Sequence, residues 1–159
     1  MSIALPLTLA LTIGIGTIVM KYFKPQELVD RGTFERMGDN ALSLFSPEVL
    51  IALDDLREYF NTSITVNNWS TEGQFQWRGW RTPEKARELS SPNSQHAKGN
   101  AFDCTIKWYT AAEARKIIVA NQNHELLKRI TRLEDGVSWL HFDCMVLPVN
   151  KKRIYLFKV

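Results

Sequence analysis

The sequence is poor in cysteine and contains no repeated motif. Only 2 of its 159 residues are cysteine, and neither lies in a Cys-x-x-Cys metal or redox pattern. A disulfide scaffold is therefore excluded. Tracts of glycine, proline or serine and internal repeats are absent, which excludes fibrous, disordered and solenoid architectures. The length is that of one ordinary domain with its own hydrophobic core.

The sequence also has almost no excess of positive or negative charge. Twenty basic and 17 acidic residues give a net charge of +3, and no run of lysine or arginine occurs. The composition therefore argues against a nucleic-acid partner. Hydrophobic residues make up 45% of the chain and charged residues 23%, as expected for a folded protein.

The first twenty residues carry no charge, and the stretch from Ile3 to Met20 has about the minimum length of a membrane-spanning helix. Three interpretations remain open: a retained membrane anchor, a secretory signal, or an arm buried against protein. A signal would lack its usual basic start and a clear cleavage site. The basic residues that follow, Lys21, Lys24 and Arg31, favour a cytoplasmic domain, which conflicts with export. We therefore divide the chain into segment 1–20, a candidate contact with a membrane or virion, and one domain over 21–159.

Hydrophobic periodicity and capping patterns predict the elements of that domain. Ser46-Pro47-Glu48 is typical of a helix start, and Thr110 with Glu113 matches a capping box. Short helices interleaved irregularly with β-branched strands predict an α+β fold, with a mainly antiparallel sheet and flanking helices. We expect helices at 25–37, 47–60 and 110–121, a long loop at 67–83, and strands at 64–66, 101–108, 130–133, 138–146 and 153–159.

Two of the three histidines stand in unusually polar surroundings. His96 precedes a predicted strand that contains Asp103, and Gly99 between them permits a turn toward the carboxylate. His141 lies in another predicted strand. Two imidazoles and one carboxylate leave one tetrahedral position open, which is the catalytic arrangement for zinc. The sequence therefore predicts a zinc site at His96, Asp103 and His141.

Strand alternation assigns the neighbours of these residues to faces. Asp143 shares a face with His141, and we expect it to orient a ligand imidazole. Cys104 and Cys144 lie on the opposite face. They are predicted to be buried thiols, with a disulfide as the alternative if their strands are adjacent.

The motifs together resemble a known superfamily. Ser-x-His-x-x-Gly-x-Ala-x-Asp (94–103) and Trp-x-His-x-Asp (139–143) are similar to those of zinc D-alanyl-D-alanine carboxypeptidases and their hedgehog-like relatives. Gly79-Trp-Arg-Thr-Pro83 resembles their upstream Gly-Tyr-Arg-Ser segment, and Leu133-Glu-Asp-Gly136 resembles a turn of short phage and prophage peptidases. The resemblance covers residues 22–147. It implies a hedgehog/DD-peptidase-like fold with His96, Asp103 and His141 as zinc ligands.

The position of the general base departs from the pattern of that superfamily. Many relatives carry an acid three residues before the second histidine, where this chain has Ser138. Glu134 is our first candidate to carry the proton and Asp135 the second, since zinc does not deliver a proton to the leaving amine. The alternative is that both acids only form a polar turn.

Arg81 is the candidate to bind an anion of the substrate or transition state, by a planar pair of hydrogen bonds. Arg78 is its rival, and a plain surface charge is the alternative for either. Trp69, Trp77 and Trp80 are predicted walls of a substrate groove, with core packing as the alternative. Ser94 and Gln95 are expected to assist by hydrogen bonds.

The resemblance implies a zinc metallopeptidase that cleaves peptidoglycan stem peptides at a bond involving a D-amino acid. Carboxypeptidase and endopeptidase activities, in phage lysis or on a virion, both fit. The alternative is a non-catalytic, metal-stabilised virion or interaction protein with the same fold. A third hypothesis, a membrane-anchored binding module, requires no metal.

Overall fold

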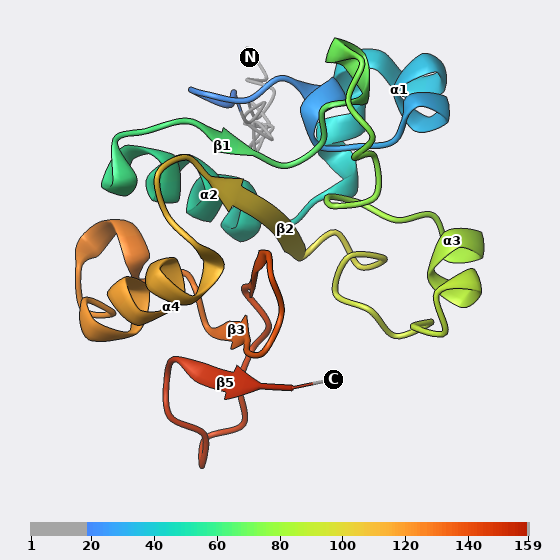
Figure 1. Cartoon of the computed structure of the whole chain (residues 1–159). Helices are drawn as coiled ribbons and strands as arrows, with labels where there is room; N and C mark the ends of the chain where they lie inside the picture. Colours follow the sequence, from blue (N-terminus) through green and yellow to red (C-terminus); the bar gives the residue numbers. More distant parts are fainter. Residues whose placement is uncertain (1–18, 159) are drawn as a thin grey trace, which may run out of the picture.

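A mainly antiparallel sheet forms the centre of the molecule. The computed structural model describes residues 19–158, and there five strands follow the order β1-β2-β4-β3-β5 (Figure 1). β5 joins β3 in parallel, and all other neighbours are antiparallel. The strands are β1 (Ile64–Thr65), β2 (Ala101–Ile106), β3 (Arg132–Glu134), β4 (Leu140–Asp143) and β5 (Tyr155–Phe157). The predicted α+β class is confirmed. Apart from Val19 and Met20, the segment 1–20 lies outside the described residues.

The pairing of β2 with β4 separates an apolar face from a polar face. Phe102 lies opposite Phe142, and Asp103 lies opposite His141. Side chains alternate along each strand, so both phenylalanines enter the core and both polar residues face the other way. The register therefore sets two of the predicted metal ligands side by side.

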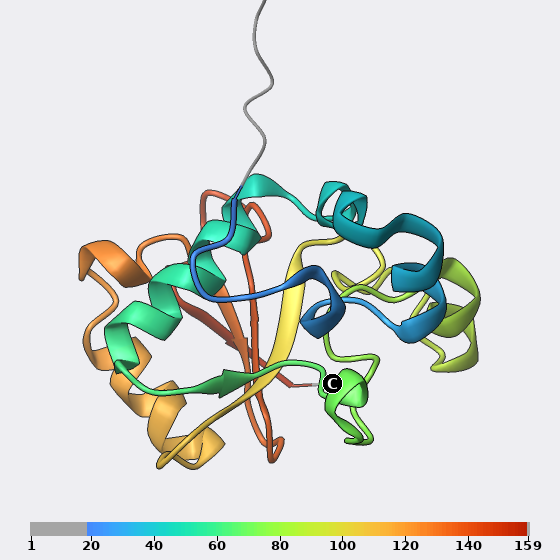
Figure 2. The ribbon, with the colours of Figure 1, turned by 90° about the horizontal axis from the view of Figure 1, so that it is seen from above.

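Two helices cover the apolar face. α2 (Pro47–Phe60) begins at Ser46, whose hydroxyl accepts a hydrogen bond from the Val49 amide, and α4 (Ala111–Ala120) begins with the predicted Thr110 and Glu113 capping box. Both helices lie on one side of the sheet in Figure 2, and α3 (Pro83–Glu88) lies on the other. The core between helices and sheet contains fully buried side chains, among them Leu50, Leu53, Leu56, Ile118, Phe102 and Phe142.

The predicted helix at 25–37 is wrong as one element. It is divided into a 3-10 turn, η1 (Pro25–Glu27), and α1 (Arg31–Met37). Asp30 between them is extended, and its carboxylate accepts a hydrogen bond from the Thr33 amide, which starts a new helix. The predicted stop at Gly38 is confirmed, with φ of 53°, and a further 3-10 segment, η2 (Gly38–Leu44), follows.

Other differences concern lengths and short elements. The strand predicted over 101–108 ends at Ile106, and Trp108 adopts a left-handed φ of 74°, which a strand cannot continue. β4 is likewise shorter than 138–146. α3 was not predicted, although Thr82-Pro83-Glu84 repeats the start pattern of α2 and Thr82 caps it. The 3-10 turns η3 (Trp69–Thr71) and η4 (Glu125–Leu127) were also not predicted.

The cysteines are free thiols, so the disulfide alternative is wrong. Although β2 and β4 are neighbours, the register places Cys104 opposite Leu140, four residues before Cys144. Cys104 is fully buried in the core and Cys144 is half-buried. The two thiols therefore lie too far apart along the strands for a bond.

Candidate metal centre

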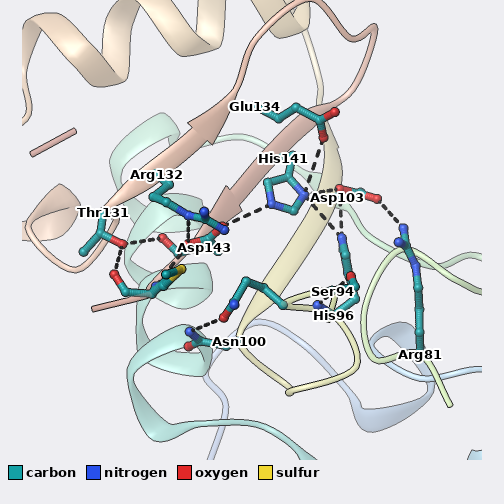
Figure 3. A network of polar contacts seen from close by, with 12 residues as sticks. Arg81, Ser94, His96, Asn100, Asp103, Thr131, Arg132, Glu134, His141 and Asp143 are labelled. Carbon is teal, nitrogen blue, oxygen red and sulfur yellow. Dashed lines mark hydrogen bonds and ion pairs between the residues drawn. The ribbon is translucent and has the colours of Figure 1, made fainter. Parts of the chain in front are cut away.

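Three side chains from separate parts of the chain converge on one buried point (Figure 3). Asp103 Oδ1 lies 2.7 Å from His141 Nδ1 and 3.2 Å from His96 Nε2. The two imidazole nitrogens are 3.3 Å apart. All three residues are buried, and their ligand atoms lie within 4.8 Å of one another. This group could hold a metal ion, as the spacing in the sequence predicted.

A tight turn brings His96 to the sheet. Gly99 has φ of +63°, and a Cβ there would lie 1.8 Å from the Leu44 carbonyl oxygen, so only glycine fits. The Gly99 amide donates to the His96 carbonyl at 3.1 Å, which closes the turn. The predicted role of Gly99 is thus confirmed.

The His96 ring is fixed by the backbone. Its Nδ1 lies 2.8 Å from the carbonyl oxygen of Gly79. A carbonyl can only accept, so Nδ1 carries the proton and Nε2 presents its lone pair to the other two side chains. The Gly79 backbone also packs closely against Leu28. A Cβ on Gly79 would lie 1.8 Å from the Leu28 carbonyl oxygen, so this position also requires glycine. Such a bond to the second nitrogen is typical of metal-binding histidines.

A second carboxylate stands behind His141. Asp143 Oδ2 lies 3.4 Å from His141 Nε2, while Nδ1 faces Asp103 and His96. Asp143 is completely buried and accepts three hydrogen bonds from the Arg132 guanidinium at 2.7–3.0 Å and one from the Met145 amide. The Asp143 carboxylate is therefore held in place on the side of His141 away from Asp103.

Burial and neighbouring charges oppose each other in this group. Burial lowers the pKa of His96, because the imidazolium is poorly solvated. Burial also disfavours the charged form of Asp103, but His96 and His141 outweigh it and hold the pKa of Asp103 well below its usual range. At His141, hydrogen bonds to Asp103 and Asp143 overcome burial and raise the pKa to about 9. These shifts favour neutral His96 and charged Asp103, the forms in which such side chains bind metals, and a metal held by His141 would have to displace its proton.

Glu134 lies beside the three ligands. Its Oε2 is 4.0 Å from His141 Nδ1, and its side chain lines the cavity described below. Burial raises the pKa of Glu134 above its ordinary value, although His141 opposes the shift. Asp135 does not line that cavity: it is partly exposed and lies within 4.0 Å of Arg115 and Lys158. Ser138 is exposed on a different part of the surface.

The two arginines are placed differently. Arg81 lines the cavity, and its Nη2 donates to Asp103 Oδ2 at 2.8 Å while its Nε donates to the Trp77 carbonyl at 2.8 Å. Arg78 lies outside the cavity, donates to the Thr105 hydroxyl and stacks on the Phe75 ring. Arg81 is therefore the arginine next to the candidate ligands, and part of its charge is already paired with Asp103.

Ser94 and Gln95 line the cavity. The Ser94 hydroxyl accepts from the His96 amide, and the Gln95 carbonyl group accepts from Asn100, so both also brace the turn. The expected tryptophan walls are placed elsewhere. Trp80 packs against the hydrophobic core, and Trp69 donates its indole N–H to the Val29 carbonyl.

The cavity next to the three ligands has a volume of about 650 Å³. Its aromatic walls are Trp139 and Phe157, and the edge of the Phe157 ring meets the His141 ring at a centroid distance of 5.6 Å. Trp139 precedes β4, so strand alternation does not place it, and its signal in the sequence is its position in the Trp-x-His-x-Asp motif. Phe157 comes from β5, and no local pattern points to it. The lining residues are Arg81, Ser90, Ser91, Pro92, Asn93, Ser94, Gln95, His96, Lys98, Asp103, Arg132, Glu134, Trp139, His141, Met145 and Phe157.

Comparisons with known proteins add no assignment: no family model, curated protein or solved structure matches this chain. Within residues 19–158, none of the helices has the length and apolar character needed to cross a membrane.

Proposed function

We propose that this chain is a zinc-dependent peptidase with a hedgehog/DD-peptidase-like fold that hydrolyses peptidoglycan stem peptides. The observation that carries the proposal is the position of Glu134. A partly buried carboxylate lies 4.0 Å from one member of a buried His-Asp-His group, at the wall of a cavity large enough for a short peptide. A purely structural metal site has no need of such a neighbour.

The donor set suits zinc. His96 Nε2, His141 Nδ1 and one oxygen of Asp103 are the ligand atoms, and two imidazoles with one carboxylate leave a position for water or substrate. When bound, zinc supplies a Lewis acid that polarises the scissile carbonyl and makes water more acidic. The remaining chemistry belongs to the side chains around it.

Glu134 then acts as the proton carrier. Its raised pKa keeps the carboxylate basic enough to accept a proton from the attacking water and acidic enough to pass it to the leaving amine. Arg81 keeps Asp103 charged and oriented through its Nη2, and the rest of its guanidinium faces the cavity side, where negative charge develops. Trp139 and Phe157 exclude water from one side of the reacting group.

The proposed substrate is a stem peptide containing a D-amino acid, cleaved as a carboxypeptidase or an endopeptidase. It rests on the motif resemblance, and the neutral polar side chains of Ser94 and Gln95 at the cavity suit an uncharged peptide backbone. Segment 1–20 is proposed to contact a membrane or a virion, which would place the protein at the cell wall. A nucleic-acid partner is not proposed.

A non-catalytic, metal-stabilised protein is the second candidate. One observation favours it: the position that carries an acid in many relatives is Ser138, which is exposed and lies away from the cavity. Both candidates retain the metal, so only turnover of a substrate distinguishes them.

The test compares the zinc-loaded full chain with Glu134→Gln on purified peptidoglycan and on stem peptides with free and cross-linked ends. New amino groups and the masses of the products are measured. Glu134→Gln is expected to lose at least a hundredfold in turnover while retaining zinc. Glu125→Gln, which changes an exposed carboxylate on η4, is the matched control and should retain full activity.

Three outcomes would change the proposal. No product from any substrate, with zinc bound, would favour the non-catalytic alternative. Full activity of Glu134→Gln would overturn the assignment of the base. Loss of activity in Asp135→Asn, with Glu134→Gln unaffected, would transfer the role to Asp135.

A further inference from the structure

A buried arginine on the helix layer reaches the loop between β3 and β4. Arg115 of α4 is only 8% exposed. Its Nη1 donates to the Trp139 carbonyl at 3.1 Å and its Nη2 to the Val137 carbonyl at 3.0 Å. Its Nε lies 3.7 Å from Asp135 Oδ1. One guanidinium therefore contacts three of the five residues 135–139.

This loop joins two parts of the candidate site. Glu134 is the last residue of β3, and His141 is the second residue of β4. The loop turns at Gly136, which has φ of +86°, and carries Trp139 to the cavity wall. The pairing of Leu133 with Phe142 brings Glu134 and His141 next to each other, and residues 135–139 close the hairpin directly beyond them.

The chemistry of arginine suits this task. A guanidinium presents donors in a fixed planar arrangement, so two carbonyls bound to it are held at a defined separation. A lysine ammonium at the same place is a point charge on a flexible stem and imposes no such geometry. A buried cation that served only stability would be weakly justified, because its desolvation offsets much of what its contacts contribute.

We propose that Arg115 is a positioning residue of the metal centre: it fixes the β3–β4 loop and so sets the placement of His141 and Glu134. The proposal rests on the metal site of the proposed function, and it does not depend on peptidase activity. Without the guanidinium fork, the chain binds metal more weakly and with a different ligand geometry. Both effects are larger than the accompanying loss of stability would cause.

The chain offers a matched control in Arg153. Its Nε donates to the Ile130 carbonyl at 3.1 Å and its Nη2 to the Leu127 carbonyl at 2.7 Å. Arg153 therefore also bridges two backbone carbonyls, one at the end of η4 and one three residues later, and it does not line the cavity. Arg153→Lys removes the same kind of contact without touching the loop that carries the site.

The experiment measures zinc affinity by competition with a chelator, the visible spectrum of the Co²⁺ form, and the melting temperature. The full-length protein, Arg115→Lys and Arg153→Lys are compared. Both variants are expected to melt at lower temperature. Only Arg115→Lys should lose about tenfold or more in zinc affinity, the effect typical of residues that orient metal ligands. Only its Co²⁺ spectrum should change.

Equal zinc affinities and Co²⁺ spectra for both variants would overturn the positioning role and leave the proposed function standing. If the unaltered chain binds neither ion, both proposals fail. Should Arg115→Lys not fold, Arg115→Met occupies similar space without a buried charge, and the same criteria apply to it.

Discussion

Asp103 and His141 face each other across β2 and β4, with Asp103 Oδ1 2.7 Å from His141 Nδ1. They are a cross-strand pair 38 residues apart in the chain. His96, from the turn before β2, completes the group on the side of Arg81. The candidate metal site is therefore built largely on the sheet, and strand pairing holds two of its three side chains next to each other.

The first prediction concerns the metal itself. The full chain is expected to bind one zinc ion, and the double variant His96→Ala/His141→Ala none, because two of three ligands are lost. Elemental analysis after dialysis measures this. His124→Ala is the control, since the third histidine is exposed, caps η4 and packs edge-on against Tyr59, outside the cavity. Zinc at one hundred times its Kd should stabilise the chain by about 2.7 kcal/mol. Stoichiometric zinc in the double variant would contradict the assignment.

The second prediction separates the two arginines. Arg81→Lys keeps the charge but loses the planar fork, and we expect turnover of stem peptides to fall about a hundredfold, or roughly 3 kcal/mol. Arg78→Lys should change turnover little, because Arg78 lies outside the cavity. Zinc content shows how Arg81 acts. A parallel loss of zinc affinity indicates support of Asp103, and unchanged affinity indicates contact with substrate. A large loss of turnover in Arg78→Lys, with little change in Arg81→Lys, would mean that Arg78 binds the anion.

The third prediction tests the carboxylate behind His141. Asp143→Asn should lower zinc affinity about 10- to 100-fold, because an amide orients the imidazole less firmly than a carboxylate. It also leaves Arg132 without its buried partner, at a cost of about 3 kcal/mol in the free energy of unfolding. Asp55→Asn breaks a more exposed pair with Arg129, outside the cavity, and should leave zinc affinity unchanged. Chelator competition and urea unfolding measure both effects, and equal zinc affinities in the two variants would refute this role.

The fourth prediction concerns Trp139, whose indole Nε1 is buried without a hydrogen-bond partner among the described residues. A buried N–H without a partner costs free energy, and Trp139→Phe removes this N–H. The gain offsets the packing that is lost with the smaller ring, so the free energy of unfolding should change by less than about 1 kcal/mol. Trp69→Phe instead removes the indole donor to the Val29 carbonyl, which keeps a hydrogen bond from the Asn67 side chain, and should cost about 0.5–1.5 kcal/mol. Urea unfolding compares them. A larger loss for Trp139→Phe would show that its N–H has a partner in solution.

The fifth prediction uses the thiols. Burial raises the pKa of Cys144 to about 12, and it raises the pKa of Cys104 further. The thiolate is the reactive form, so at pH 8 both cysteines should react with iodoacetamide at least about 100-fold more slowly in the folded chain than in urea. The rate for Cys144 should rise as pH increases toward its pKa. Mass spectrometry follows the reaction. Rapid labelling at pH 8, or a disulfide in the unreduced protein, would contradict the structure.

The sequence by itself determined the local features. Ser46-Pro47-Glu48 and the Thr110/Glu113 box specify the starts of α2 and α4, because capping needs only residues within one turn. The spacing from His96 to Asp103 and the alternation from His141 to Asp143 indicated which side chains share a face. A turn at Gly99 was likewise expected from its place between His96 and Asp103, and the structure has it.

Only the tertiary structure decided what surrounds these residues. Glu134 was separated from Asp135, and Arg81 from Arg78, by the direction in which each side chain leaves the sheet or loop. Phe157 reaches the cavity because β5 returns in parallel beside β3, and Arg115 reaches the β3–β4 loop from the far side of the sheet. The helix expected at 25–37 divides because Asp30 caps a new helix, a local choice that its apolar pattern does not show. Local propensity acts over a few residues, whereas register and packing join residues far apart in the chain, and these long-range contacts set the geometry of the site.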